Sequence, residues 1–347
     1  MPSRFPPVAR LLVIAFVLAL SPTAIGQQPV DPPRGDYRFV VFGDFNGSYG
    51  ALEYAPAVAK AIRAITDRWR PELLLSPGDV VAGQNRSLPV ERFGAMWQLF
   101  DREVAGPLRQ GAIPYAVAMG NHDASSLQDR NGSFIFERER EAARHYWSDP
   151  MNDANLNYID RQHFPFDYAF RTERAFVVVL DASSADIALQ QREWLKRVLG
   201  LPTARSAALR IVVGHLPLAP VGHGRDRIGE VIREPAALRR ILEGGNVDLY
   251  ISGHHAAYYP GRLEGLELLF AGGVGARRLL AGDQPARSTV TLVDVWWEPL
   301  EVRYSTFDLA NMQLMSPASL PPVIGSGDDA VRLSERAYPA ALEPAQR

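Results

Sequence analysis

The chain has 347 residues, of which 47% are hydrophobic and 22% are charged, a composition typical of a globular protein and not of a disordered one. Its 37 lysines and arginines nearly balance its 39 aspartates and glutamates, which leaves a formal net charge of -2. This balance gives neither a basic field for nucleic acid nor a polybasic signal for anionic lipid. The absence of cysteine excludes disulfides and attachment of a lipid to cysteine.

The amino terminus has the pattern of a secretory signal peptide. Arginines precede the apolar run Leu11 to Leu20, and the small residues Ala24 and Gly26 follow it. Because the run is short for a membrane span, we expect a signal peptide over 1–26, cleaved after Gly26, with an uncleaved anchor as the alternative. A Pro-rich leader then covers 27–36. The mature protein is expected in a periplasm or outside the cell, with no stable membrane span.

Apolar runs bounded by Gly, Pro or Asp alternate with amphipathic segments from residue 37 to residue 310. This alternation predicts an α/β domain, and the last strands, which follow one another without helices, add an antiparallel part and so mixed sheets. From residue 311 to residue 347 the chain is rich in Pro, Ser and Ala, and we expect a tail that packs on the surface or is partly disordered. The predicted strands are Tyr37 to Phe42, Leu73 to Ser76, Ile113 to Met119, Ala175 to Leu180, Leu209 to Val213, Val247 to Ile251, Leu266 to Phe270, Val290 to Trp296 and Glu301 to Ser305. The predicted helices are Leu52 to Trp69, Val90 to Val104, Phe134 to Trp147, Leu189 to Leu199 and Pro235 to Leu242.

Five of the predicted strands end in a glycine followed by a side chain that can bind metal. In open α/β sheets ligands bind outside the carboxyl ends of the strands, and glycine lets the backbone turn there and approach closely. The five strand ends are Gly43-Asp44, Gly78-Asp79, Gly120-Asn121-His122-Asp123, Gly214-His215 and Gly253-His254-His255.

Together these residues offer carboxylate, amide and imidazole groups. That mixture suits an iron, manganese or zinc ion better than the all-oxygen shells of calcium or magnesium. Such an ion activates water and polarises a phosphoryl oxygen. His122 can deliver a proton, and the neighbouring Asp123 can hold its other ring nitrogen, cap the following segment, or do both.

The ordered set of five motifs resembles the calcineurin-like metallophosphoesterase superfamily, which includes the purple acid phosphatases. The resemblance runs from about Arg38 to Pro260 and includes a helix with Gln191, Trp194 and Leu195 ahead of the fourth motif. It implies a four-layer α/β/β/α sandwich with two mixed β-sheets.

The resemblance also implies the metal ligands. Asp79 would bridge two metals, and Asn121, His215 and His254 would complete the shell of the second metal. Asp44 would belong to the first metal.

The other ligands that the resemblance implies for the first metal are missing. Asn46 stands where the family has a histidine, Ala256 stands at the second histidine of Gly-His-x-His, and Ala82 stands at the tyrosine of the purple acid phosphatases. Asn46 can still offer an amide oxygen. His255 is the candidate to compensate, although neighbouring side chains in extended backbone face opposite ways. We therefore expect one firm metal site and one weak or empty site.

The expected function is that of a secreted metal-dependent phosphoesterase, acting on a small-molecule or surface-displayed phosphate mono- or diester. A metal-activated water would attack in line, and His122 would protonate the leaving group or bind the phosphoryl charge. The alternative is a catalytically impaired binding protein on the same fold. A serine hydrolase lacks a Gly-x-Ser-x-Gly motif and would keep its activity under chelation.

Two further groups of residues stay open between a functional and a structural role. His223 or Arg225, in a glycine-flanked loop, could reach a phosphate at the rim of the site, or the segment could be a plain loop. Tyr258 and Tyr259 could stack on a substrate ring, or they could pack inside the domain.

Overall fold

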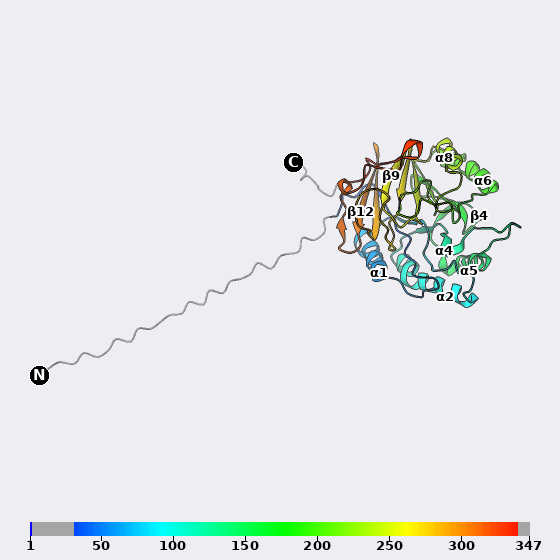
Figure 1. The fold of residues 1–347 in the computed structure, drawn as a ribbon, viewed down its shortest axis with the longest axis horizontal. Coiled ribbons are helices and arrows are strands. Elements are labelled where there is room, and N and C mark those ends of the chain that lie inside the picture. Colours follow the sequence, from blue (N-terminus) through cyan, green and yellow to red (C-terminus); the bar gives the residue numbers. More distant parts are fainter. Residues whose placement is uncertain (2–30, 339–347) are drawn as a thin grey trace. The chain divides into compact units, whose positions relative to one another are not determined.

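Two mixed β-sheets form the framework of the chain in this computed structural model, which describes Met1 and residues 31–338 (Figure 1). The chain divides into a short unit, Met1–Asp31, and a compact unit, Pro32–Arg347. The predicted signal peptide, apart from Met1, lies outside the described residues. In the part that is described, no helix combines the length and apolarity that a membrane crossing requires.

The first sheet has six strands in the order β13-β12-β11-β1-β2-β3. β1 pairs in parallel with β2, and β2 with β3, whereas β11 runs antiparallel to β1 and to β12. The strands are β1 (Tyr37–Val41), β2 (Leu73–Ser76), β3 (Tyr115–Val117), β11 (Thr289–Trp297), β12 (Leu300–Asp308) and β13 (Gln313–Leu314).

The second sheet has nine strands in the order β14-β15-β9-β10-β8-β7-β6-β5-β4. Its centre is parallel, from β6 through β7 and β8 to β10, and antiparallel strands flank it on both sides. The strands are β4 (Asn157–His163), β5 (Asp167–Arg171), β6 (Ala175–Val179), β7 (Leu209–Val213), β8 (Leu249–Ser252), β9 (Tyr259–Leu263), β10 (Leu266–Phe270), β14 (Val323–Ile324) and β15 (Val331–Leu333).

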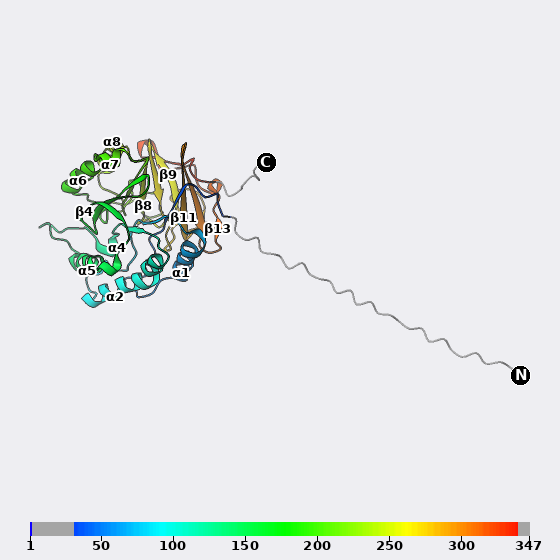
Figure 2. The same cartoon turned by 180° about the vertical axis from the view of Figure 1, so that it is seen from behind.

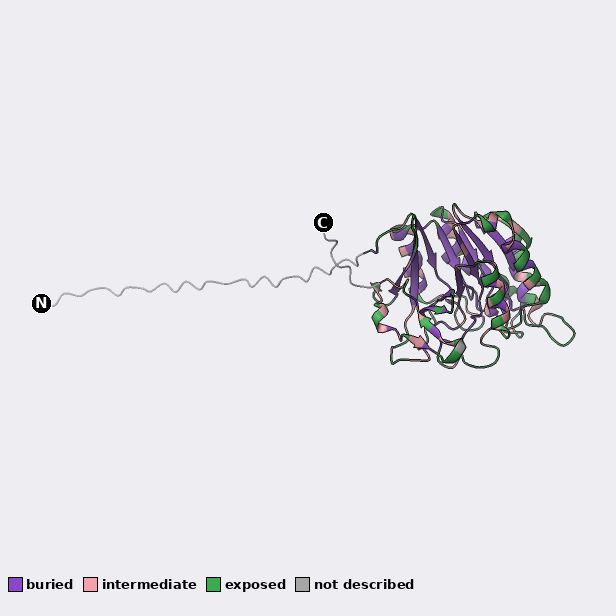
Figure 3. Cartoon of the chain, turned by 90° about the horizontal axis from the view of Figure 1, so that it is seen from above, coloured by how far each residue is buried: buried purple, intermediate pink, exposed green. Residues whose placement is uncertain are grey.

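Helices cover the outer faces of the two sheets. Along β1, Val40 faces a core shared with the helices beside the first sheet, while Phe39 and Val41 face the core between the sheets, because successive side chains point to opposite faces. Figures 1 and 2 show α1, α2 and α5 on one side and α6 and α8 on the other, and Figure 3 shows the buried strands between more exposed helices. The layer order is α/β/β/α. The α-helices are α1 (Pro56–Arg63), α2 (Val90–Phe100), α3 (Gly106–Gln110), α4 (Asn121–Ala124), α5 (Glu137–Ser148), α6 (Leu189–Leu199), α7 (Pro202–Arg205) and α8 (Pro235–Gly244).

Short π- and 3-10-helical segments complete the pattern. The π segments Ala64–Trp69 and Asp101–Ala105 continue α1 and α2, so the long helices predicted from the sequence are present as composite elements. The first of them begins at Pro56 and not at Leu52, because proline fits the first turn, where no intrahelical partner is needed for its nitrogen. The 3-10 turns are Pro150–Asn152, Pro317–Ser319 and Gly327–Asp329.

The structure differs from the predicted elements at the outer strands. β4, β5 and β9 were not predicted: β4 is largely exposed and polar, so it lacks the apolar run that marks a buried strand. Residues 311–338, expected as a tail, instead add β13 to the first sheet and β14 and β15 to the second. Backbone pairing at a sheet edge recruits such short segments without a strong hydrophobic signal.

Arg140 on α5 joins this helix to the end of β6. Its guanidinium ion pairs with the buried Asp181 (2.9 Å) and donates to the carbonyl of Ala124 (2.8 Å). The rings of Phe134 and Phe166 lie 4.2 and 3.8 Å from the guanidinium carbon. Because Ala124 directly follows the Gly120 to Asp123 motif, Arg140 fixes the loop that carries this motif.

Substitution of Arg140 by Ala should lower the free energy of unfolding by about 3–5 kcal/mol, because it leaves Asp181 buried without its ion partner. Arg140→Lys should lose less, since the charge remains while the planar contacts are lost. The matched control is Lys196→Ala, which breaks an exposed pair with Glu193 and should cost at most about 1 kcal/mol. Urea unfolding measures all three. Equal effects of Arg140→Ala and Lys196→Ala would contradict a structural role for the buried pair.

Candidate metal centre

The five motif loops leave the carboxyl ends of parallel strands of both sheets. Asp44 follows β1, Asp79 follows β2, Asn121 follows β3, His215 follows β7 and His254 follows β8. Three of these residues, Asp44, Asp79 and His254, have a left-handed backbone, with φ of 49°, 55° and 65°. Left-handed backbone is costly for residues other than glycine and is found mostly where function or tight packing demands it.

Two glycines of the motifs let the carboxylates approach neighbouring backbone. A Cβ atom on Gly120 would lie 2.2 Å from Asp79 Oδ1, and one on Gly253 would lie 2.2 Å from Asp44 Oδ2. No larger residue fits at either position without displacing a carboxylate. The repeated order of a glycine directly before a polar residue therefore has a steric cause in both sheets.

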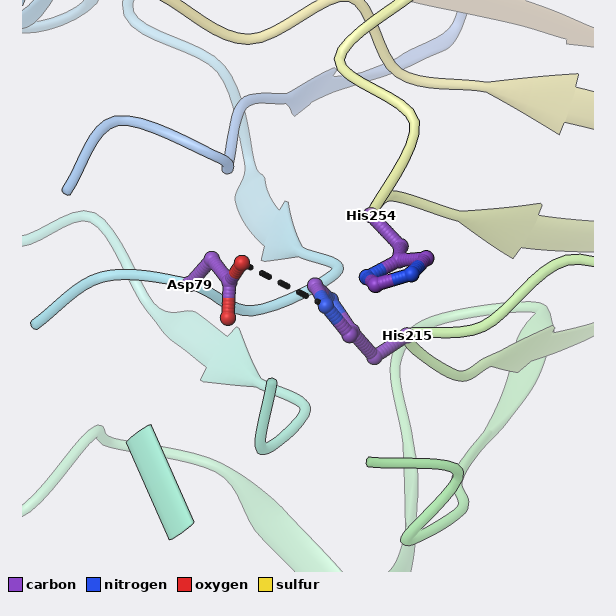
Figure 4. Close-up of side chains that lie close together, drawn as sticks. All are labelled: Asp79, His215 and His254. Carbon is purple, nitrogen blue, oxygen red and sulfur yellow. Dashed lines mark ion pairs between the residues drawn. The ribbon is translucent and has the colours of Figure 1, made fainter. Parts of the chain in front are cut away.

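Asp79, His215 and His254 converge on one point (Figure 4). Each offers one ligand atom, and these atoms lie within 4.8 Å of one another. Asn121 completes the cluster: its Oδ1 lies 2.8 Å from His215 Nε2 and 2.8 Å from His254 Nδ1. The four residues predicted for the second metal are thus together in the structure.

Each of the two histidines uses one ring nitrogen for a hydrogen bond to the surrounding protein. The other ring nitrogen faces Asn121 and carries no proton in the neutral ring. His215 Nδ1 lies 2.8 Å from the carbonyl oxygen of Pro77, to which it can only donate. His254 Nε2 lies 2.8 Å from the carboxylate of Glu230, to which it donates in the same way. The opposite nitrogens then present lone pairs to the oxygen of Asn121. Lone pairs that face one another at 2.8 Å require a cation or an added proton between them, so the donor set fits a metal ion.

The pKa values of His215 and Asp79 point the same way. Burial by itself would lower the pKa of His215, but the nearby Asp79 and Asp44 and the carbonyl of Pro77 raise it to about 9. Burial would raise the pKa of Asp79, yet His215 and His122 bring it below its ordinary value. This pair therefore favours a positive charge between its side chains, whereas burial lowers the pKa of His254 to about 4.

Asp44 lies at the edge of the cluster. Its Oδ1 accepts the backbone N–H of His254 at 2.6 Å, and its buried Oδ2 has no hydrogen-bond partner. Burial raises the pKa of Asp44 to about 8. A buried carboxylate oxygen without a partner is costly, and a cation at this side of Asp79 would relieve it.

Glu230 and Arg225 lie behind His254 and hold its ring in place. The sequence analysis named Arg225 as a candidate but did not name Glu230. Arg225 donates to the Glu230 carboxylate, and the hydrogen bonds from His254 and Arg225 lower the pKa of Glu230 to about 2. Carboxylates that hold the far nitrogen of a metal-binding histidine fix its tautomer and orientation. Arg225 was a candidate for direct phosphate contact, whereas His223 in the same loop is exposed and lines no part of the cavity at the cluster.

Asp123 does not hold the ring of His122, so that prediction is wrong. Its carboxylate accepts the backbone N–H groups of Asp79, Val80, Val81 and Gly120 at 2.7–2.8 Å. With all four bonds made to backbone, the carboxylate shapes the turn that presents Asp79.

His122 lies beside the cluster, on the side that faces the cavity. Its Nε2 lies 4.0 Å from Asp79 Oδ2, and its Nδ1 lies 3.4 Å from the carbonyl oxygen of Gly83. Its backbone N–H donates to Asp79 Oδ1 at 2.9 Å. The ring of Tyr49 stacks on the imidazole, with 5.2 Å between centroids. No motif in the sequence identified Tyr49. The available signal was its position between Gly47 and Gly50, shortly after the first motif.

His255, the candidate to compensate for the missing ligands, does not point into the cluster. His255 is fully buried, and its Nε2 lies 2.9 Å from the backbone oxygen of Glu230 while its Nδ1 faces the backbone N–H of Val221. The amide nitrogen of Asn46 lies 3.5 Å from the backbone oxygen of Gly47, and ligation by its amide oxygen stays a prediction. Ala82 and Ala256 are buried at the positions of the missing ligands. Compensation by His255 is therefore contradicted by its contacts.

A cavity of about 420 Å³ opens onto Asp79, Asn121, His122 and His254. Tyr258 and Tyr259 do not line it; both are buried, and Tyr259 begins β9, so they serve packing. A groove of about 580 Å³ between α6 and α8 is larger but contains none of the motif residues.

Comparison with solved structures supports the same fold. Purple acid phosphatase PPD1 from yellow lupin (Lupinus luteus) seeds is 14% identical, with a TM-score of 0.55, and the match covers 83% of this chain and 54% of that one. GAP50, described as the anchor in the inner membrane complex of Plasmodium, is 13% identical, with a TM-score of 0.52 and coverage of 87% and 91%. The chain thus spans about half the length of the lupin enzyme. No curated protein matches the sequence.

The family model of calcineurin-like phosphoesterases matches residues 37–258, which include all five motifs and the strands that carry them. The expected resemblance is confirmed over most of the chain, together with the α/β fold of two mixed sheets. The chain belongs to the calcineurin-like phosphoesterase family.

Proposed function

We propose that this protein is a secreted, metal-dependent phosphoesterase that hydrolyses a small-molecule or surface-displayed phosphate ester. The observation that carries the proposal is the convergence of Asn121 Oδ1 with His215 Nε2 and His254 Nδ1 beside the carboxylate of Asp79. The cluster lies on the cavity, so a substrate can reach it. The amino-terminal pattern supports export, followed by cleavage after Gly26.

Asp79, Asn121, His215 and His254 would hold one iron, manganese or zinc ion, and Asp44 would contribute to a weaker second site. Such an ion supplies Lewis-acid charge to a phosphoryl oxygen and makes water a better nucleophile. Glu230 and the carbonyl of Pro77 keep the two histidines in the tautomers that ligation needs.

His122 would serve as the acid in this reaction. It is partly exposed to the cavity and close to Asp79, so its Nε2 can donate a proton to the leaving oxygen. The carbonyl of Gly83 and the stacked ring of Tyr49 orient the imidazole in place of Asp123.

A binding protein on the same fold is the competing function. The buried Ala82 and Ala256 favour it, since they leave the first-metal shell without two ligands. GAP50, whose fold is similar, is described as an anchor. Metal content per chain separates the two functions: a bound ion with turnover of nitrophenyl phosphate supports the enzyme, and no ion with no turnover supports the binding protein.

Substitution of Asn121 or His215 by Ala should abolish bound metal and phosphatase activity together, because each removes a ligand from the one complete shell. Elemental analysis and hydrolysis of mono- and bis-nitrophenyl phosphate measure the two effects. His163→Ala is the control and should change neither, because His163 is exposed at the end of β4 and does not line the cavity. Retention of metal and activity in both ligand variants would refute the proposed centre.

Substitution of His122 by Asn should lower kcat by about 10²- to 10⁴-fold, the usual contribution of a positioned acid, while the metal content stays unchanged. The loss should shrink for esters whose leaving groups need no protonation. Parallel measurement of kcat for nitrophenyl and alkyl phosphates tests this. The same loss for both esters would contradict proton donation by His122.

Replacing Glu230 by Gln should weaken metal binding by about 10- to 100-fold, because the carboxylate no longer fixes the tautomer of His254. Competition with a chelator of known affinity measures the change. Glu193→Gln, on an exposed face of α6, is the matched control and should bind metal as the wild type does. An unchanged metal affinity in Glu230→Gln would exclude the support role.

A further inference from the structure

The outer part of the cavity carries three exposed apolar side chains. Tyr49, Leu127 and Ile228 come from three different loops and line the same cavity as the metal cluster. Their exposed fractions are 58%, 41% and 96%. Large apolar side chains gathered in one exposed place beside polar groups are typical of a surface that binds a ligand.

The charged side chains of this part of the cavity are already paired with one another. Arg233 forms an ion pair with Asp186 at 2.7 Å, and Arg225 is paired with Glu230. The two arginines that line the cavity are thus matched by two lining carboxylates, so the described lining has no excess of positive charge for a second anionic group of a substrate. The cavity favours an uncharged group next to the phosphate.

The serine hydroxyls of the lining are also engaged. Ser183 Oγ donates to the carboxylate of Asp181, and Ser184 Oγ shares a hydrogen bond of 2.8 Å with Ser126 Oγ. Ser125 Oγ accepts the backbone N–H of Leu127. Recognition of a polyhydroxylated group would need free hydroxyls, and the hydroxyls of these three serines have partners within the protein.

Tyr49 lies beside the position that the leaving group would occupy in the proposed reaction. One face of its ring stacks on His122, at 5.2 Å between centroids and 28° between planes. His122 faces the leaving oxygen in the proposed reaction, so the group attached to that oxygen lies beside Tyr49. A planar ring can stack or pack edge to face on the exposed part of the tyrosine.

We propose that Tyr49, with Leu127 and Ile228, forms a leaving-group subsite for an aromatic, uncharged group, so that the substrate class is an aryl or similarly planar phosphate ester. The position of the phosphate rests on the proposed function. The aromatic preference rests on Tyr49, the apolar rim and the paired charges around it.

Two phosphonates test the subsite without turnover, because their carbon–phosphorus bond is not hydrolysed as an ester. Benzylphosphonate carries a ring at the position of the leaving group, and ethylphosphonate carries only a methyl group there. Calorimetry with the metal-loaded full chain should show benzylphosphonate binding about tenfold more tightly, from ring contact and apolar burial. Tyr49→Ala should lose most of this preference, with unchanged metal content, whereas Tyr49→Phe should keep it.

Leu189→Ala is the control, because Leu189 is exposed on α6 and does not line this cavity. It should bind both phosphonates as the wild type does. Equal binding of the two phosphonates, or a preference that survives Tyr49→Ala, overturns the subsite and leaves the proposed hydrolysis standing. Failure of the metal-loaded protein to bind either phosphonate overturns the proposed function and the subsite with it.

Discussion

The hydrogen bonds to the Asp123 carboxylate are the constraint on which the site depends. Two oxygens accept four backbone N–H groups, from the loop after β2 and from the loop after β3. The bonds tie these loops together and force Asp79 into its left-handed backbone, where its carboxylate receives the N–H of His122. Without these bonds, the carboxylate of Asp79 and the amide of Asn121 would not be held at a fixed distance from each other. The histidines of the second sheet would then lose the positioned ligands with which they form the cluster.

The site is asymmetric because support is present on one side only. His215 is held by Pro77, His254 by Glu230, and Glu230 by Arg225, so both histidines of the shell have a second contact behind them. On the other side, Asp44 contributes one carboxylate, while Ala82 and Ala256 fill space without offering an atom for ligation. The proposal of one strongly bound ion rests on these second contacts as well as on the number of ligands.

The sequence predicted the central strands and the motif residues well because both leave a local signal. β2, β7 and β10 match their predicted bounds, and buried parallel strands read as apolar runs that end in glycine. The outer strands β4 and β9 and the short strands β13 to β15 gave little such signal, since their place is decided by pairing with a neighbour. Glu230 and Tyr49 were missed for the same reason: each acts through a residue distant in the chain, and neither belongs to a motif.

By itself, the sequence determined the family, the α/β class, and which side chains can bind a metal, because these depend on residue type and order along the chain. Tertiary structure alone decided what each side chain does. Asp123, beside His122 in sequence, turns to the backbone of another loop, while Tyr49, distant in the chain, stacks on that imidazole. His254 and His255 are neighbours, yet only the first reaches the cluster, because the backbone turns one inward and the other toward Val221 and Glu230. Contacts of this kind arise from the packing of loops from two sheets, which no local pattern encodes.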